Sequence, residues 1–260
     1  MSRRLAACGM TVARVLVACL LLISVGDAAA QVALPSTRVV IRAEQGAVTV
    51  PLHNMGEVPV LVQAWIAEGD PNQPPEQSAA PFAMAPPLMR LDPGKDKPLR
   101  IRTLAARAPT DGREHLYWLN VHTISSRPEQ AQGDRLELPV RSIYKLLYRP
   151  AGLSAPTAKR AEVVTVQLRG QGTARSLIVA NPTPYYLNLG DVTLLHASGD
   201  TRLGNPHVAP FGSVAISIPD DAPDGRLSAR LNWIDDDGRL LPIVRELDHG
   251  PAVDPRAGVN

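Results

Sequence analysis

The 260-residue chain contains very little cysteine, and the little it has lies near the start. Its two cysteines, Cys8 and Cys19, both precede Ala30, and none follows. If the first 30 residues are removed, the remaining chain can form neither a disulfide nor a thiolate metal site. A chain of about 230 residues can bury enough apolar surface to fold without such cross-links, as one large domain or two smaller ones.

The sequence also lacks an apolar run long enough to span a membrane. Three arginines precede a short apolar run over residues 15–25, and small residues follow up to Ala30. A charged start, a short apolar segment and small residues at its end are typical of a secretory signal peptide. Cys19 lies inside the run, which argues against lipidation at this position. We therefore predict a cleavable signal peptide over residues 1–30, and no membrane anchor.

Net charge of either sign is nearly absent. Residues 1–30 contain Arg3, Arg4, Arg14 and Asp27, so their removal lowers the formal net charge from +2 to 0. Proteins that bind nucleic acid usually carry a basic surface, and this balance gives no indication of one. We therefore predict no nucleic-acid partner.

Motifs of common enzymes and metal sites are missing as well. The six histidines are scattered without a zinc-binding spacing, and there is no GxSxG, Walker or Rossmann motif. The acidic run at residues 235–238 resembles the start of a calcium loop, but the glutamate that such a loop requires is missing at its spacing. We predict an acidic turn here, and no catalytic residue, metal or cofactor.

The sequence does contain many short apolar or alternating segments, separated by turn residues. No segment keeps a helical period for three turns, and the 25 prolines suit strand edges and corners. This pattern predicts an all-β fold of sandwich type. The expected strands cover residues 37–42, 47–50, 58–66, 99–102, 116–124, 136–148, 163–168, 176–180, 185–195, 214–218, 227–234 and 240–247.

The length and one break in the strand pattern predict two sandwiches. The longest expected strand ends close to Pro150, and the small residues after it show no strand pattern and form a linker. We predict an N-terminal domain over residues 31–152, a C-terminal domain over residues 153–250, and a flexible tail over residues 251–260.

Four motifs resemble those of the periplasmic pilus chaperones of the chaperone–usher pathway, and they occur in the same order. They are a Pro-Pro segment with an Arg-Leu-Asp-Pro-Gly turn (85–94), Arg-Glu-His-Leu-Tyr-Trp-Leu-Asn-Val-His-Thr-Ile (113–124), Tyr-Lys-Leu-Leu-Tyr-Arg-Pro (144–150) and Asn-Pro-Thr-Pro-Tyr-Tyr (181–186). Two departures are His115, where the family usually has a small hydroxyl residue, and Ser125-Ser126, where it favours proline. The resemblance covers nearly all of the chain after residue 30.

This resemblance implies both a fold and a function. Members of the family have two immunoglobulin-like β-sandwich domains in a boomerang arrangement. They bind, stabilise and deliver pilus or fimbrial subunits to an outer-membrane usher in the periplasm, and they do so by donor-strand complementation. The chain is thus expected to be a chaperone without catalysis, whose partners are pilin subunits and the usher.

The resemblance also gives roles to particular residues. A basic pair that anchors the client's C-terminal carboxylate in the cleft of the family corresponds to Arg38 and Lys145. A charged trio that bridges the two domains corresponds to Glu114, Arg149 and Asp236.

The donor strand is indicated by its own pattern as well as by the resemblance. Leu136, Leu138 and Val140 lie on one face of the expected strand and would fill an apolar groove of the client. An ordinary half-buried edge strand would show the same alternation, but the basic residue Lys145 on this strand favours donation. Pro139 has no N–H group, so one hydrogen bond of the ladder is lost.

Two other classes of function stay open at this point. One is a secreted sandwich that binds carbohydrate or a surface, which would need exposed aromatic residues clustered on one face. The other is a secreted β-rich hydrolase, for which the sequence offers no pairing of a nucleophile with a base.

Overall fold

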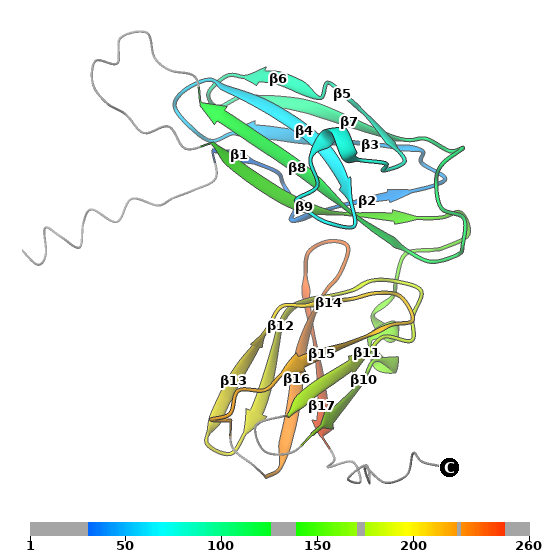
Figure 1. The fold of residues 1–260 in the computed structure, drawn as a ribbon, viewed down its shortest axis with the longest axis vertical. Coiled ribbons are helices and arrows are strands. Elements are labelled where there is room, and N and C mark those ends of the chain that lie inside the picture. Colours follow the sequence, from blue (N-terminus) through cyan, green and yellow to red (C-terminus); the bar gives the residue numbers. More distant parts are fainter. Residues whose placement is uncertain (1–30, 126–138, 171–174, 223–224, 248–260) are drawn as a thin grey trace, which may run out of the picture. The chain divides into compact units, whose positions relative to one another are not determined.

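The computed structural model describes residues 31–125, 139–170, 175–222 and 225–247. The predicted signal peptide, the predicted tail, and Leu136 and Leu138 of the donor strand lie outside these ranges. Within them the chain forms β-strands and two short 3₁₀ helices, which supports the all-β prediction (Figure 1). No helix of these ranges is long and apolar enough to cross a membrane.

In the described ranges, the N-terminal sandwich consists of nine strands and one 3₁₀ helix. These elements are β1 (Val32–Ala33), β2 (Arg38–Arg42), β3 (Ala47–Asn54), β4 (Val60–Glu68), η1 (Pro75–Gln77), β5 (Phe82–Ala85), β6 (Leu88–Leu91), β7 (Asp96–Thr103), β8 (His115–Ser125) and β9 (Val140–Arg149). One sheet has the order β1-β3-β7-β5, and the other has the order β2-β9-β8-β4-β6. The pairs are antiparallel except for β2 and β9, which are parallel.

Alternate residues of each strand form the core of this sandwich. In β7, Leu99 and Ile101 are fully buried, whereas Arg100 and Arg102 are exposed. This is the alternation that the sequence predicts for a half-buried strand. Burial of each such aliphatic side chain stabilises the fold by about 1.5–3 kcal/mol.

The chain changes from one sheet to the other between β1 and β2, and β2 pairs with only part of β9. β1 pairs with β3 in one sheet, and the chain then crosses to pair β2 with β9 in the other. The partners of β2 are residues 145–149 of β9 only. Residues 140–144 therefore pair with β8 on one side and, within the described part of the chain, with no strand on the other.

The C-terminal sandwich begins with a second 3₁₀ helix. Its elements are η2 (Ala158–Val163), β10 (Thr165–Arg169), β11 (Ser176–Ala180), β12 (Leu187–His196), β13 (Gly199–Gly204), β14 (His207–Val208), β15 (Ser213–Ser217), β16 (Leu227–Ile234) and β17 (Leu240–Leu247). The smaller sheet has the order β10-β11-β15. The larger sheet has the order β13-β12-β16-β17, and β14 also pairs with β12.

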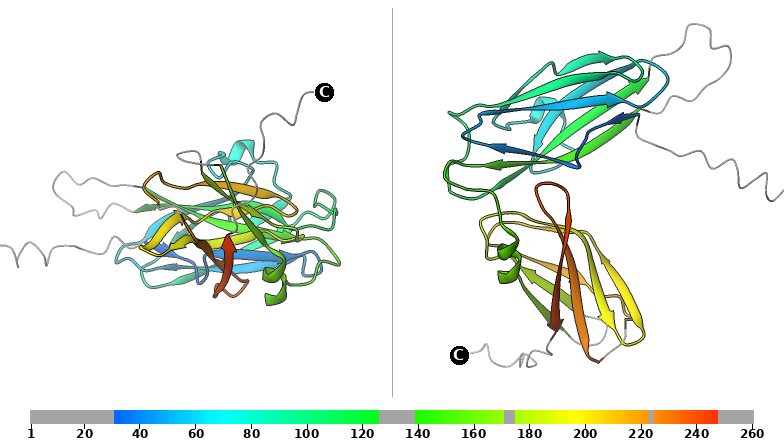
Figure 2. Two further views of the ribbon diagram at one scale, coloured as in Figure 1. Left: turned by 90° about the horizontal axis from the view of Figure 1, so that it is seen from below. Right: turned by 180° about the vertical axis from the view of Figure 1, so that it is seen from behind.

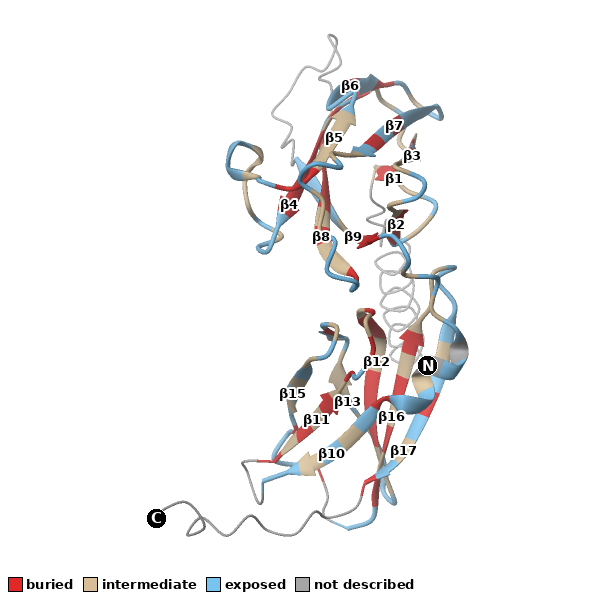
Figure 3. Ribbon diagram, turned by 90° about the vertical axis from the view of Figure 1, so that its right-hand side faces the viewer, coloured by how far each residue is buried: buried red, intermediate tan, exposed pale blue. Residues whose placement is uncertain are grey.

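The core of the second sandwich follows the two central strands of its larger sheet. Leu194 of β12 and Leu227 and Leu231 of β16 are fully buried, and the buried residues of these strands are red in Figure 3. The hairpin of β16 and β17, orange to red in Figure 2, is closed by the acidic run at residues 235–238. Gly238 lies there at φ 82°, a left-handed conformation that favours glycine. The predicted acidic turn is therefore present.

The sequence pattern missed five short strands, among them the two that have only two residues. The missed elements are β1, β5, β6, β13 and β14, which have two to six residues each. Segments this short show too few alternations to give a period, and neighbouring strands determine their pairing. The expected linker also differs, because η2 begins within it at Ala158.

Candidate functional site

Parallel pairing of β2 with β9 places the two predicted anchor residues side by side. Arg38 and Lys145 are direct partners in the ladder, so their side chains lie on the same face of the sheet. Arg38 is buried, and its Nη1 donates to the carbonyl oxygen of Ile234 at 3.1 Å. Lys145 is half-buried, and its Nζ donates to Oδ1 of Asn188 at 2.9 Å. Both cations thus meet polar oxygens of the second sandwich.

Neither cation of this pair forms an ion pair with a residue that the structure describes. Among the residues that the structure describes, no carboxylate forms an ion pair with Arg38 or Lys145, and Arg38 Nε is buried without a hydrogen-bond partner. Burial, together with the charge of Arg38, lowers the pKa of Lys145 to about 8. Burial also lowers the pKa of Arg38, although nearby carboxylates act against this shift. Binding of an anion at Arg38 and Lys145 would therefore be favourable, because its charge would stabilise both cations.

The predicted charged trio comes together around one guanidinium. Arg149 Nε donates to Glu114 Oε1 at 2.7 Å, and Nη1 and Nη2 donate to the two oxygens of Asp236 at 2.6 Å each. Arg149 and Glu114 are almost completely buried, whereas the Asp236 side chain is 28% exposed. Glu114 and Arg149 belong to the N-terminal sandwich, and Asp236 lies in the turn between β16 and β17. The guanidinium thus links the two sandwiches.

Two further contacts hold the trio in place. Glu114 Oε2 accepts a hydrogen bond from the backbone N–H of Tyr186 at 2.8 Å, and the Arg149 guanidinium lies over the ring of Tyr185 at 5.6 Å. Burial raises the pKa of Glu114, although Arg149 and this N–H oppose the shift. A buried carboxylate with a raised pKa depends on its cationic partner for its charge.

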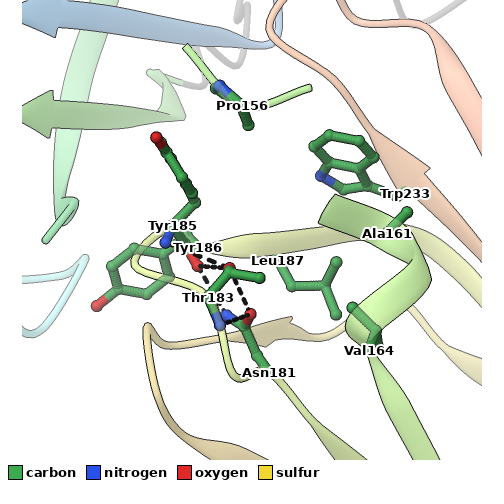
Figure 4. Close-up of a pocket in the computed structure, with 9 residues that line it drawn as sticks. All are labelled: Pro156, Ala161, Val164, Asn181, Thr183, Tyr185, Tyr186, Leu187 and Trp233. Carbon is green, nitrogen blue, oxygen red and sulfur yellow. Dashed lines mark hydrogen bonds between the residues drawn. The ribbon is translucent and has the colours of Figure 1, made fainter. Parts of the chain in front are cut away.

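The Asn-Pro-Thr-Pro-Tyr-Tyr motif forms the loop that supplies these tyrosines. The buried side chain of Asn181 donates to the carbonyl oxygens of Tyr185 and Ala209, at 2.7 and 3.0 Å. Its oxygen accepts from the N–H and the hydroxyl of Thr183, at 3.1 and 2.7 Å. Figure 4 shows the hydrogen bonds among Asn181, Thr183 and Tyr185 beside a small pocket, which is also lined by Pro156, Trp233 and Ala161 of η2. The motif therefore has a structural role, which is to fix the loop.

A cluster of aromatic rings, whose position the sequence did not predict, lies next to Lys145. Trp118 is the β8 partner of Lys145, and its ring centroid is 5.8 Å from that of His207. The ring centroid of Tyr186 is 6.0 Å from that of His207. His207 is in turn the strand partner of Asn188. Trp118 and Tyr186 lie in two of the quoted motifs, but no local sequence signal predicts their contact with His207, because the register of distant strands brings these rings together.

Only the last of the three predicted zipper residues lies in the described part of the chain. Val140 is the first residue of β9 and is 43% exposed. It lies on the face of β9 that packs further along into the core through Leu146 and Tyr148, opposite to Lys145. Val140 thus presents an apolar side chain at the edge of β9 that no strand of the described ranges pairs with.

Two family models match consecutive parts of the chain. Residues 31–154 match the family described as "Pili and flagellar-assembly chaperone, PapD N-terminal domain". Residues 159–243 match "Pili assembly chaperone PapD, C-terminal domain". The chain therefore belongs to the family of pili assembly chaperones, as the sequence motifs predicted.

Individual relatives and solved structures agree with this family. The chaperone protein FimB/FhaD of Bordetella pertussis is 40% identical over 225 residues, which are 83% of this chain and 87% of the relative. The crystal structure of the YadV chaperone has a TM-score of 0.70 at 26% identity, with 84% of this chain and 100% of the other covered. The SafB chaperone of Salmonella enterica, solved in complex with the SafA pilin, matches with a TM-score of 0.68 at 29% identity, with coverage of 85% and 99%. The predicted fold of two immunoglobulin-like sandwiches is confirmed.

Proposed function

We propose that the protein is a periplasmic chaperone that binds and stabilises pilus or fimbrial subunits and delivers them to an outer-membrane usher by donor-strand complementation. The observation that carries this proposal is on β9, where the edge of residues 140–144, which pairs with no strand of the described ranges, leads directly to Lys145 and its neighbour Arg38. A relative in this family has been solved with a pilin bound, which supports the choice of client. A carbohydrate-binding function is not favoured, because the family is one of assembly chaperones.

The geometry of β9 determines how a client strand would bind. The C-terminal carboxylate of the client would pair with Arg38 and Lys145, and its last strand would extend from there along residues 140–144. Since the client chain ends at Lys145, it would run in the same direction as β9, in line with β2. Main-chain hydrogen bonds along this edge would supply affinity, and the charge pair would set the register.

The remaining parts of the chain have supporting roles in this proposal. Leu136, Leu138 and Val140 would enter the client's open groove, and the trio of Glu114, Arg149 and Asp236 would hold the two domains. Residues 1–30 would direct export to the periplasm and then be removed. The domains would extend over residues 31–152 and 153–250, with no catalysis and no cofactor.

Removal of the basic pair tests this function. We expect Arg38→Ala and Lys145→Ala each to be exported and folded but to retain much less subunit, because a charge-assisted hydrogen bond contributes about 1.5–3 kcal/mol. The measurement is co-purification with a pilin subunit encoded beside the chaperone gene. Lys97→Ala, which changes an exposed lysine on β7, is the matched control and should retain subunit as the wild type does. Undiminished co-purification from both anchor variants would contradict the proposal.

A further inference from the structure

One buried amide lies directly beside the basic pair. Asn188 of β12 is 2% exposed, and its Oδ1 accepts the hydrogen bond from Lys145 Nζ. A lysine ammonium can only donate, so the contact fixes which way the amide faces, with its oxygen toward Lys145. The NH₂ group of Asn188 must then face away from this contact.

That NH₂ group is free to serve another acceptor. Among the described ranges of the chain, no residue accepts a hydrogen bond from Asn188 Nδ2. Amide bond lengths place Nδ2 about 2.2 Å from Oδ1, so it lies at most about 5 Å from Lys145 Nζ. The two oxygens of a carboxylate are also about 2.2 Å apart. One carboxylate that lies between Asn188 Nδ2 and Lys145 Nζ can therefore accept a hydrogen bond from each of them.

A second donor in the same place also lacks an acceptor. Arg38 Nε is buried and has no hydrogen-bond partner, whereas its Nη1 is bound to Ile234. An unpaired buried donor is costly, so Arg38 Nε calls for an acceptor that the described residues do not supply. Arg38 of β2, Lys145 of β9 and Asn188 of β12 thus bring donors to the same part of the molecule, and no described carboxylate accepts from Arg38 Nε, Lys145 or Asn188 Nδ2.

We propose that Asn188 is a third residue of the client anchor, whose NH₂ group donates directly to the client's C-terminal carboxylate. This inference rests on the proposed function and adds a neutral donor from the second sandwich to the basic pair of the first. Because the amide also accepts from Lys145, it orients the ammonium toward the same carboxylate. A client whose last strand ends in a free carboxylate is therefore recognised by both sandwiches together.

Two synthetic peptides and a size-matched substitution test the proposal. The peptides alternate leucine and threonine, carry two lysines at the start for solubility, and differ only in ending as a free carboxylate or as a carboxamide. Asn188→Leu keeps the size of the side chain and removes both hydrogen bonds. We expect it to lower the affinity for the carboxylate peptide about tenfold, because a hydrogen bond to a charged group usually contributes about this much. The affinity for the carboxamide peptide should stay nearly unchanged. Asn205→Leu, at an exposed asparagine between β13 and β14, is the control.

The same substitution in a Lys145→Met background separates direct binding from mere positioning of Lys145. If Asn188 donates to the carboxylate itself, Asn188→Leu still lowers the remaining preference for the carboxylate peptide. If Asn188 only orients the ammonium, the substitution has no further effect there, and the proposal is overturned. Equal losses for both peptides would also overturn it, because they would show a structural role.

A measurement on the wild-type protein covers the case in which Asn188→Leu does not fold. The side-chain NH₂ signal of Asn188 in an NMR spectrum should shift on addition of the carboxylate peptide and stay in place with the carboxamide peptide. No shift with the carboxylate peptide would refute direct donation. If the wild-type protein bound neither peptide, the proposed function itself would fail, which differs from binding without participation of Asn188.

Discussion

The guanidinium of Arg149 gives the most specific prediction for the stability of this protein. Arg149→Met replaces a side chain that is 1% exposed by one of similar length, so it removes charge with little loss of packing. The carboxylate of Glu114 would then be left buried with one remaining partner, the N–H of Tyr186. Breaking a buried ion pair in this way costs about 3–5 kcal/mol, and we expect a loss of this size.

Removal of either acidic residue should cost less, because Arg149 then keeps one partner. We expect Asp236→Asn, at the more exposed end of the trio, to destabilise least. Urea unfolding of the wild type and the two variants measures these differences, with transitions followed by two probes because a two-domain chain can unfold in steps. Small-angle scattering should show a larger radius of gyration for Arg149→Met if the trio holds the domains.

Acidification tests whether the unpaired carboxylate of Glu114 causes the loss of stability in Arg149→Met. Burial already raises the pKa of Glu114, and loss of Arg149 removes the charge that opposes this shift. The unpaired carboxylate of Arg149→Met should therefore take up a proton as the pH falls, and the stability deficit relative to wild type should shrink. A variant as stable as wild type at neutral pH, or a deficit that does not change on acidification, would refute the reasoning.

Two further predictions concern client binding. Leu138→Glu should abolish subunit capture, because a carboxylate would have to enter an apolar groove unpaired. We expect little effect on the unfolding of the free chaperone. Protection of subunits from proteolysis at the wild-type level would contradict the predicted role of Leu138. Affinity for a carboxylate peptide should be highest below about pH 8 and should fall above it. The reason is that Lys145 in the protein without client has a pKa lowered to about 8, so its ammonium loses its proton there. Lys145→Arg should keep its affinity to higher pH, and parallel pH profiles of the two proteins would contradict the role of Lys145.

Local sequence patterns gave the strand content of both sandwiches. The alternation of Leu99 and Ile101 with Arg100 and Arg102 can be read without any other part of the chain, because successive side chains of a strand point to opposite faces. The shortest strands could not be found in this way. β1 and β14 have two residues each and exist because β3 and β12 offer them a partner.

The sequence by itself therefore determined the fold class, the family and the residue types of the predicted anchor and the predicted trio, since the ordered motifs carry these. Only the tertiary structure decided how they meet. Parallel pairing across the sheet makes Arg38 and Lys145 neighbours, and the β16–β17 turn brings Asp236 to Arg149 from 87 residues away. Asn188 had no sequence signal at all. Its position beside Lys145 depends on the register of two separate sheets, and register is a property of long-range packing that no local pattern encodes.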